Sequence, residues 1–169
     1  MIASLIRISL TVITIYGFLG SSNAFSAQAP DFKLDGQQKQ VKLSNYRGQI
    51  VYLDFWASWC QPCRKSFTWM NKMQSLYGNE GFKVIAINLD ESRTEANKFL
   101  QQIPANFDVA FDPRGNTAES YKVKAMPSSY LIDKNGKVIH SNLGFRGNDE
   151  DILEEKIRGL LRPSTVASR

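Results

Sequence analysis

Two segments of the chain are almost continuously apolar and rich in β-branched residues. They run from Ile50 to Phe55 and from Phe82 to Leu89. A strand that is covered on both faces has this pattern, whereas a strand with one face in water alternates apolar and polar residues. Both segments are therefore predicted to be buried strands, and the first is expected at the centre of a sheet.

Helical spacing follows each of these strands. From Pro62 to about Tyr77, apolar residues recur every three or four positions, at Phe67, Met70, Met73, Leu76 and Tyr77. Proline is tolerated in a first helical turn, and Gly78 is expected to end the helix. A second helix is predicted from Thr94 to about Ile103. This alternation predicts parallel strands joined by helical crossovers.

Two hairpins are expected outside this region. Phe32–Leu34 and Val41–Leu43 are short strand candidates separated by polar residues and a glycine, and they suit an edge of the fold. Ser128–Asp133 and Lys137–Ser141 flank Asn135-Gly136, the strongest short-range hairpin signal. The second pair is therefore predicted to be antiparallel.

The remaining elements complete an α/β pattern. Val109–Phe111 is a strand candidate and Thr117–Tyr121 a short helix. Asn148 can cap a last helix with an acidic first turn, whose apolar face consists of Ile152, Leu153, Ile157, Leu160 and Leu161. The elements predict a central mixed sheet flanked by helices, with an N-terminal hairpin and an extra strand–helix insertion.

The N-terminal residues 1–24 differ from the rest in composition. Arg7 is their only charged residue, an apolar run covers positions 8–19, and small residues follow up to Ala24. This is the composition of a secretory signal peptide, and cleavage is predicted after Ala24. The rival interpretation is an uncleaved membrane anchor, but the run is short for a span of roughly 20 residues. The mature chain, residues 25–169, is thus expected to be exported to the periplasm.

Composition places the mature chain among globular proteins. With 169 residues in total, 43% of them hydrophobic, the chain can bury one core and is too short for two ordinary domains. One domain is predicted, with its core at about 30–161, and a monomer is expected. The formal charge is +5, but the basic residues are interspersed with acids and form no stripe. Nucleic-acid binding is therefore not expected.

Cys60 and Cys63 are the two cysteines of the chain. In an exported protein a cysteine pair is normally read as a structural disulfide. Here the bridge would close a loop of two intervening residues, which stabilises far less than the roughly 3 kcal/mol expected for a 15-residue loop. The spacing is therefore better explained by redox chemistry.

The position of the pair indicates how the two thiols differ. Cys60 follows the predicted strand, and Pro62 begins the predicted helix. A thiol at a helix N-terminus faces unpaired N–H groups and the positive end of the helix dipole, which favour the thiolate that attacks disulfides. Cys60 is predicted to be the nucleophile. Cys63, one turn further on, is predicted to expel the substrate from the mixed disulfide.

Three other uses of cysteine fit poorly. A zinc site needs two more ligands, and His140 is the single histidine of the chain. Haem attachment needs a histidine after the second cysteine, where Arg64 stands. The Pro-x-x-x-Thr/Ser-x-x-Cys pattern of peroxiredoxins is absent, because Leu53 and Ala57 occupy those positions before Cys60. No metal and no haem are therefore expected.

The stretch from Leu53 to Phe67, LDFWASWCQPCRKSF, resembles the active-site segment of the thioredoxin superfamily. The chain is most similar to the exported TlpA/ResA-like (DsbE-like) thiol–disulfide oxidoreductases. The signal peptide, the Arg-Lys-Ser-Phe after the second cysteine and the extra segment from Thr94 to Tyr121 favour this branch. The resemblance covers about Pro30 to Leu161. It implies a thioredoxin fold and catalysis by a redox-active Cys60–Cys63 disulfide, without a separate cofactor.

The resemblance also implies roles for further residues. Asp54 matches the buried acid that relays the proton of the second cysteine, and its place in an apolar run favours burial with a raised pKa. Met126-Pro127 matches the family's cis-proline, whose loop pairs with the substrate backbone. Three residues beside the cysteines are expected at the substrate surface: Trp59, Gln61 and Pro62. Trp56 is expected in the core.

The chain departs from the family pattern at three positions. Thr68 stands where a proline usually kinks the first helix, and Ser66 stands where some relatives have an acid. Ala86 replaces the lysine that many thioredoxins place near the buried acid. Without that ammonium group Asp54 is expected to be harder to ionise.

The sequence favours a reductant of protein disulfides. Potentials in this fold span roughly −270 to −120 mV, and Gln61-Pro62 lacks the histidine of strongly oxidising enzymes. The resemblance implies apocytochrome c as one substrate and a membrane thiol transporter as the electron donor. An oxidase or isomerase, and a peptide-binding module with incidental cysteines, remain as alternatives.

Overall fold

The computed structural model describes residues 27–162. The predicted signal peptide, residues 1–24, lies outside them. The described chain begins with a two-stranded hairpin, β1 (Lys33–Leu34) and β2 (Val41–Lys42), and a 3-10 helix, η1 (Leu43–Tyr46). Strand β3 (Ile50–Trp56), helix α1 (Gln61–Tyr77), the 3-10 turn η2 (Gly78–Glu80) and strand β4 (Phe82–Asn88) follow.

The second half adds one more strand–helix unit and a final hairpin. Its elements are α2 (Arg93–Gln102), β5 (Asp108–Phe111), α3 (Asn116–Ser120), β6 (Ser128–Ile132), β7 (Val138–Leu143) and α4 (Asp149–Leu161). These bounds agree with the sequence-based elements to within about two residues, which confirms the order of elements.

A five-stranded mixed sheet forms the centre of the fold, with strand order β5-β4-β3-β6-β7. Strands β3, β4 and β5 are parallel, whereas β6 and β7 are antiparallel to their neighbours. Every residue of β3 is buried, and β3 is the middle strand, as the apolar run at Ile50–Phe55 predicted. In the β6–β7 turn, Gly136 has a φ of 81°, which suits a glycine after Asn135. The predicted thioredoxin-like α/β fold is confirmed.

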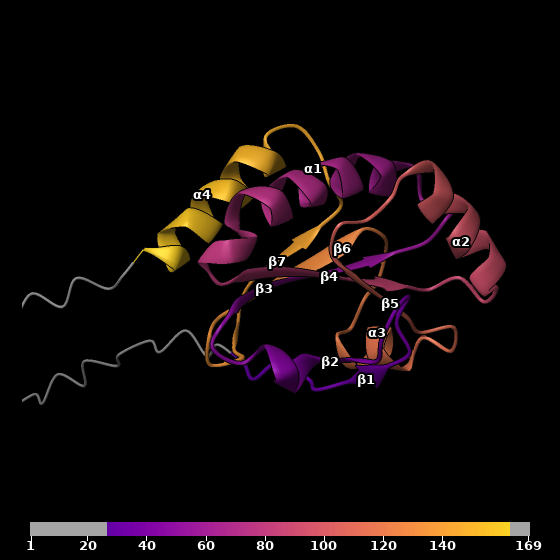
Figure 1. The fold of residues 1–169 in the computed structure, drawn as a ribbon, viewed down its shortest axis with the longest axis horizontal. Helices are drawn as coiled ribbons and strands as arrows, with labels where there is room; N and C mark the ends of the chain where they lie inside the picture. Colours follow the sequence, from indigo (N-terminus) through magenta and orange to yellow (C-terminus); the bar gives the residue numbers. More distant parts are fainter. Residues whose placement is uncertain (1–26, 163–169) are drawn as a thin grey trace, which may run out of the picture.

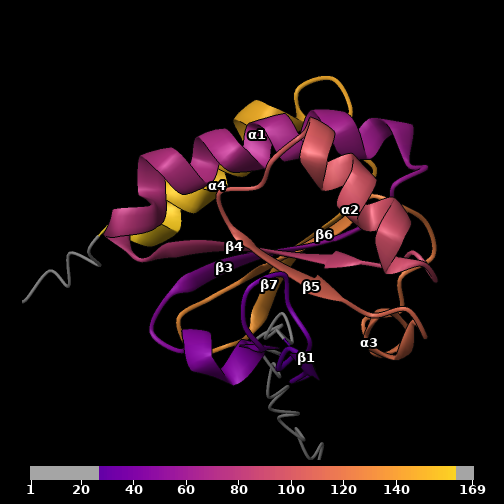
Figure 2. The same ribbon diagram turned by 45° about the vertical axis from the view of Figure 1, so that its right-hand side comes forward.

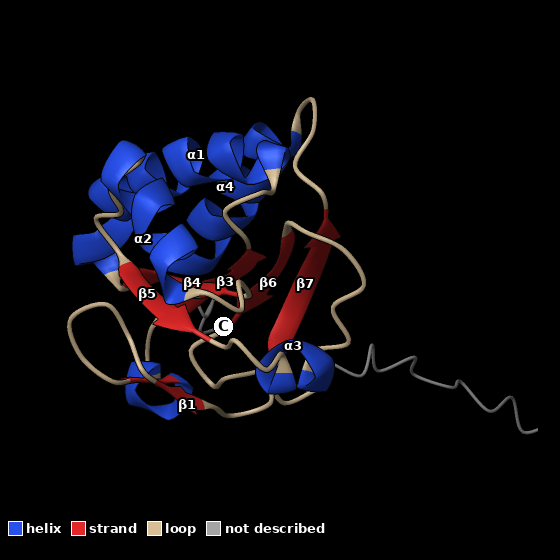
Figure 3. Ribbon diagram, turned by 90° about the vertical axis from the view of Figure 1, so that its right-hand side faces the viewer, coloured by secondary structure: helices blue, strands red, loops and turns tan. Residues whose placement is uncertain are grey.

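The sheet separates two hydrophobic clusters, and Figures 1 and 2 show the elements that lie on its two sides. Helices α1, α2 and α4 cover one face, while α3, η1 and the β1–β2 hairpin cover the other; Figure 3 shows the same three layers from the side. Along β3, alternate side chains belong to one cluster and then to the other. Tyr52 and Trp56 face α1, whereas Val51, Leu53 and Phe55 face the hairpin side.

Helix α1 buries most of the predicted apolar face. Its residues Phe67, Met70 and Met73 are completely buried, but Leu76 is 50% exposed, so that part of the prediction was wrong. Trp69 is buried instead, with its ring 5.1 Å from that of Tyr52. The helix does end before Gly78, yet the chain continues through η2 to Gly81, where φ reaches 90°.

The start of α4 differs from the sequence prediction. Asn148 is the N-cap residue but makes no side-chain capping bond. The Asp149 carboxylate accepts a hydrogen bond from the Arg146 backbone N–H at 2.6 Å instead. Ile152 is 42% exposed and not part of the buried face, which consists of Leu153 and Ile157.

The residues before and within the hairpin cross the face of the sheet that α3 and η1 also cover. They run from the β7 edge to the β5 edge. We call residues 27–37 the N-terminal strap. Gln28 forms an antiparallel bridge with Lys137 beside β7, and Gly36 forms one with Ala110 of β5. Two backbone bonds extend the second bridge, from Gln37 N to Val109 O and from Phe111 N to Asp35 O. The hairpin itself is a separate two-stranded sheet packed on this face, so the predicted edge position applies only to its loop, which bridges β5 at Gly36.

Candidate redox site

The cysteines lie at the junction of the central strand and the first helix. A tight turn follows Trp56, closed by a hydrogen bond of 3.1 Å from Cys60 N to Ala57 O. Cys60 is the N-cap of α1, with extended backbone angles, and Pro62 falls in the first turn. The first N–H groups of a helix lack intrahelical acceptors, so the positive end of the helix dipole meets Cys60.

The two cysteines form a disulfide with their Cα atoms 5.4 Å apart. Cys60 keeps 4% of its surface exposed, whereas Cys63 is completely buried. Trp59 is 70% exposed, and Gln61 and Pro62 are also exposed, so the surface around Cys60 is formed by these three neighbours. Of the two cysteines, Cys60 is therefore the one that keeps exposed surface.

Asp54 is completely buried on the face of β3 that α1 covers, between Tyr52 and Trp56 on the same face. Neither of its carboxylate oxygens has a hydrogen-bond partner. Burial away from water raises the pKa of Asp54 well above its ordinary value, as the sequence predicted. Its cross-strand neighbours are Ala86 on β4 and Ser129 on β6.

The loop before β6 brings the predicted proline to the same end of the sheet. The Met126–Pro127 peptide bond is cis. Ser128, the next residue, pairs with Phe55 near the end of β3, which places the loop beside the strand that leads to the cysteines. Pro127 is buried and Met126 partly exposed. The Pro127 carbonyl accepts a hydrogen bond from Gly144 N at 2.8 Å.

A buried polar network supports the turn from the other side. The Asp90 carboxylate accepts hydrogen bonds from Ser58 N at 2.9 and 3.2 Å, from Ser58 Oγ at 3.0 Å and from Asn88 Nδ2 at 2.7 Å. Asp90 is 8% exposed. The sequence did not lead us to predict a role for Ser58 or Asp90. A sequence pattern could have indicated this contact. Asn88 and Asp90 are polar residues at and just after the end of the buried strand β4, and β3 ends at the same edge of the sheet.

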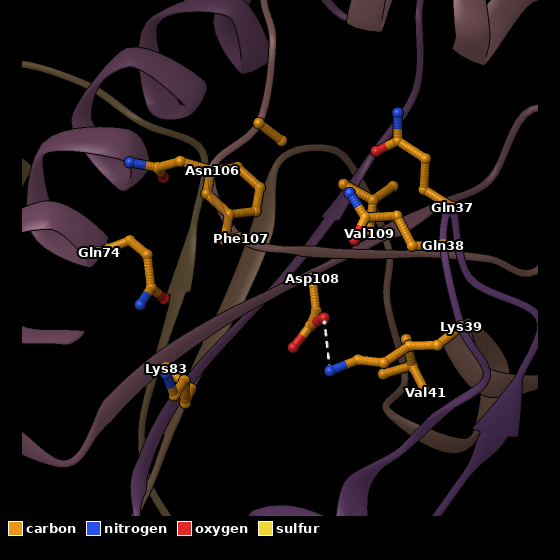
Figure 4. Close-up of a pocket in the computed structure, with 11 residues that line it drawn as sticks. Gln37, Gln38, Lys39, Val41, Gln74, Lys83, Asn106, Phe107, Asp108 and Val109 are labelled. Carbon is orange, nitrogen blue, oxygen red and sulfur yellow. Dashed lines mark ion pairs between the residues drawn. The ribbon is translucent and has the colours of Figure 1, made fainter. Parts of the chain in front are cut away.

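Two further observations on the described residues concern metal sites and a polar cavity away from the cysteines. Among residues 27–162, no group of three or more His, Cys, Asp or Glu side chains is arranged to hold a metal ion. A polar cavity of about 260 Å³ lies between the hairpin loop, the start of β5 and the end of α1 (Figure 4). No predicted site residue lines it; its walls include Gln37, Gln38, Lys39, Gln74, Lys83, Asn106 and Asp108.

Comparison with known proteins agrees with this geometry. The AhpC/TSA family profile matches residues 25–141. The thiol–disulfide oxidoreductase ResA of Bacillus thuringiensis subsp. konkukian (strain 97-27) is 36% identical over 132 residues, which cover 78% of this chain and 75% of the relative. This chain belongs to the AhpC/TSA family of the thioredoxin superfamily, among thiol–disulfide oxidoreductases of the ResA and DsbE type. The Cys60–Cys63 pair agrees with that enzymatic activity.

Solved structures of the family superimpose closely on the fold. A Chlorobium tepidum protein assigned as thiol:disulfide interchange protein DsbE is 55% identical, with a TM-score of 0.80 over 81% of this chain and 97% of that chain. The exposed lipoprotein thioredoxin Etrx1 of Streptococcus pneumoniae strain TIGR4 is 29% identical, with a TM-score of 0.68 over 78% of this chain and 100% of that chain. Within residues 27–162, no helix is long and apolar enough to cross a membrane.

Proposed function

We propose that this protein is an exported reductant of protein disulfides, in which Cys60 attacks the substrate and Cys63 releases it. The observation that carries the proposal is the Cys60–Cys63 disulfide at the start of α1, in which Cys60 is the N-cap residue and keeps the exposed surface of the pair. The cycle begins from the dithiol form. The disulfide form described above is the product of one turnover.

The proposed reaction balances as two thiol–disulfide exchanges. The Cys60 thiolate attacks one sulfur of the substrate disulfide, forms a mixed disulfide and releases the other substrate sulfur as a thiolate. Cys63, once deprotonated, attacks Cys60 Sγ and releases the second substrate sulfur. The substrate gains two electrons and two protons, and the enzyme is left with the Cys60–Cys63 disulfide.

Asp54 is proposed to take the proton from Cys63 before the second exchange. It lies on the sheet face beneath α1, the helix that carries Cys63, and its oxygens are not engaged by other donors. A carboxylate with a raised pKa is a stronger base than an exposed aspartate, which suits the removal of a thiol proton.

The substrate is proposed to bind as an extended segment across Trp59 and the Met126-Pro127 loop. Trp59 offers a large exposed apolar surface beside the nucleophile, and Gln61 and Pro62 extend it. The Pro127 carbonyl is already bonded to Gly144, so within this pair the Met126 backbone is the proposed partner for the substrate strand.

The proposed compartment is the periplasm, which the signal-peptide composition of residues 1–24 supports. A reductant that acts in an oxidising compartment needs an electron source, and a membrane thiol transporter is the proposed donor. The resemblance to the TlpA/ResA-like family supports the Cys-x-x-Cys motif of apocytochrome c as one substrate.

Two measurements test the proposed reaction. The wild type should reduce insulin in the presence of dithiothreitol, and Cys60→Ser should not. The reduction potential, measured against glutathione, should lie well below the roughly −120 mV of a strong oxidase. A value near −120 mV would contradict the reductant function and indicate an oxidase. Better refolding of scrambled ribonuclease than reduction of insulin would contradict it too and indicate an isomerase.

A third experiment identifies the substrate. A Cys63→Ala variant should hold substrates on Cys60 as mixed disulfides, whereas a Cys60→Ala/Cys63→Ala variant should hold none. Capture of cytochrome c precursors would support the specific substrate, and capture of many unrelated proteins would indicate a general reductase. A Cys60→Ser variant that complements a deletion fully would show a peptide-binding module instead.

A further inference from the structure

The turn that carries Cys60 is held by a residue of the neighbouring strand. Three hydrogen bonds join the Asp90 carboxylate to Ser58, two to its backbone N–H and one to its hydroxyl. Ser58 stands two residues before Cys60, inside the turn that the Cys60 N to Ala57 O bond closes. Bonds to a carboxylate are stronger than bonds between neutral groups, so this contact restrains the turn more than an ordinary loop contact would.

Asp90 is itself fixed on the end of β4. Asn88 Nδ2 donates to the Asp90 carboxylate at 2.7 Å, and Asp90 N donates to Asn88 Oδ1 at 3.1 Å. Asn88 pairs with Trp56 in the sheet and is 1% exposed. The network therefore connects the last residue of β3, the end of β4 and the turn of the nucleophile in one rigid unit, and the Asp90 side chain acts only as an acceptor in it.

The two cations in the first turns of α1 are engaged away from the Cys60 turn. The Arg64 guanidinium donates to Gln102 Oε1 at 2.9 Å and lies over the Phe99 ring at 5.2 Å. Lys65 Nζ lies 3.2 Å from Glu150 Oε1. These contacts direct the first cations of α1 toward α2 and α4, whereas the Asp90 carboxylate is bonded directly to the Cys60 turn through Ser58.

A negative charge in this position opposes the helix N-terminus. Two residues span at most about 7 Å between Cα atoms, so the Asp90 carboxylate, 2.9 Å from Ser58 N, lies within roughly 12 Å of the Cys60 Cα atom. Like charges at that separation disfavour each other even in a medium of intermediate dielectric constant. A less stable thiolate makes the dithiol form less stable, and couples of this fold become more reducing as their reduced form is destabilised.

We propose that Asp90 is a positioning residue of the redox centre: it fixes the Cys60 turn through Ser58, and its charge keeps the Cys60/Cys63 couple on the reducing side. This inference rests on the proposed function for its direction, since it explains why the protein donates electrons. It assigns Asp90 no contact with the substrate.

Asp90→Asn tests the role of the charge. The Cys60 thiol pKa, measured by the pH dependence of alkylation in the Cys63→Ala background, should fall by several tenths of a unit. The equilibrium constant with glutathione should shift by about two- to fourfold toward the dithiol form, which equals at most about 20 mV at roughly 30 mV per tenfold. Glu91→Gln is the matched control, because Glu91 is an exposed acid next to Asp90 and has no bond to the turn.

Ser58→Ala tests the role of the bonds. This variant keeps the charge and the backbone N–H but loses the hydroxyl bond, so the alkylation rate of the Cys60 thiolate should change while its pKa stays near the wild-type value. Circular dichroism confirms that each variant is folded. If Asp90→Asn and Glu91→Gln give the same pKa and potential as the wild type, and only the melting temperature of Asp90→Asn falls, Asp90 has a purely structural role and the proposal is overturned.

The outcome is independent of the test of the proposed function. Thiol titration and the equilibrium with glutathione need no protein substrate. If the wild type fails to reduce insulin, the proposed reductant function is contradicted, and the effect of Asp90 can still be measured. If the wild type is active and Asp90→Asn has the wild-type pKa and potential, only the proposed role of Asp90 is contradicted.

Discussion

Ala86 lies directly opposite Asp54 in the parallel pairing of β3 and β4, and both residues are completely buried. Paired residues of adjacent strands project from the same face of a sheet, so the carboxyl group has a methyl group as its neighbour on this side. On the other side stands Ser129, a neutral hydroxyl. No cation offsets the burial of Asp54 within this row, and its raised pKa follows from that arrangement.

Ala86→Lys should therefore lower the pKa of Asp54. An ammonium group within about 4–6 Å favours the carboxylate, by roughly 1–3 units for a close pair. The rate of release from the mixed disulfide, followed as a function of pH, should show its acidic limb at lower pH than in the wild type. Ala86→Met adds a side chain of similar length without charge. If both variants shift the profile equally, the effect comes from packing and the electrostatic account fails.

Asp54→Asn should increase the stability of the protein at neutral pH. A carboxyl group whose pKa is raised on folding binds more protons in the folded state, so its contribution to stability falls as pH rises from the unfolded pKa, near 3.9, to the folded pKa. Each pH unit in that window costs up to about 1.4 kcal/mol. Urea unfolding of the oxidised forms at pH 4 and pH 8 should show a gain for the variant that is larger at pH 8. A gain independent of pH would contradict this origin.

The same variant should be slow in the second exchange. Without a base, Cys63 must lose its proton to water, and general-base catalysis is typically worth roughly 10²- to 10⁴-fold. Stopped-flow measurements should show normal formation of the mixed disulfide and slow release of the substrate. Asp90→Asn is the comparison, because it should alter the first exchange. Equal slowing of both exchanges by Asp54→Asn would show a general disturbance of the site.

Trp59→Ala should weaken substrate binding without affecting folding. Its side chain is 70% exposed, and surface substitutions usually change stability by no more than about 0.5 kcal/mol. KM for insulin should rise about three- to tenfold with little change in the melting temperature. Leu76→Ala removes another exposed apolar side chain, 50% exposed near the far end of α1, and should leave KM unchanged. A similar rise in KM for both variants would exclude a specific role for Trp59.

Lys122→Gly should stabilise the fold by about 0.5–1 kcal/mol. Lys122 has a φ of 57°, and among the described residues other than glycine it alone has a positive φ. For a residue with a Cβ, this left-handed conformation has a steric cost that glycine does not have. Glycine loses more conformational entropy on folding, which offsets part of the gain. Lys124→Gly is the control in the same exposed loop and should destabilise. Thermal unfolding of the two variants measures the difference, and equal effects would show that backbone strain at Lys122 is negligible.

The sequence was sufficient for the order of elements because the two central strands are buried on both faces, which leaves a continuous apolar run at Ile50–Phe55 and Phe82–Leu89. Periodicity was less reliable at the margins of helices. Leu76 and Ile152 fit an apolar stripe by spacing, yet both are exposed, since a stripe is buried only where another element covers it. Trp69 was missed for the same reason, because the chain that covers it includes Phe145, 76 positions further on.

The candidate site also contains residues that the local sequence could locate and residues that it could not. Cys60, Cys63 and Asp54 are consecutive features of one strand–turn–helix segment, so local sequence could locate them. The bonds between Asp90 and Ser58 join segments 32 residues apart in the chain. Whether a polar residue after a strand faces solvent or a neighbouring turn depends on strand order, and periodicity does not give strand order.

The N-terminal strap limits where other polypeptides can pair with the central sheet. Strand β5 is an outer strand of the sheet, and the strap occupies backbone donors and acceptors along it. An open sheet edge is a template on which another extended chain can pair. A protein whose proposed task is to hold extended polypeptides for a moment needs them to leave again. Because the strap pairs with part of the β5 edge, less of that edge is left free for lasting pairing with the polypeptides that the site is proposed to bind.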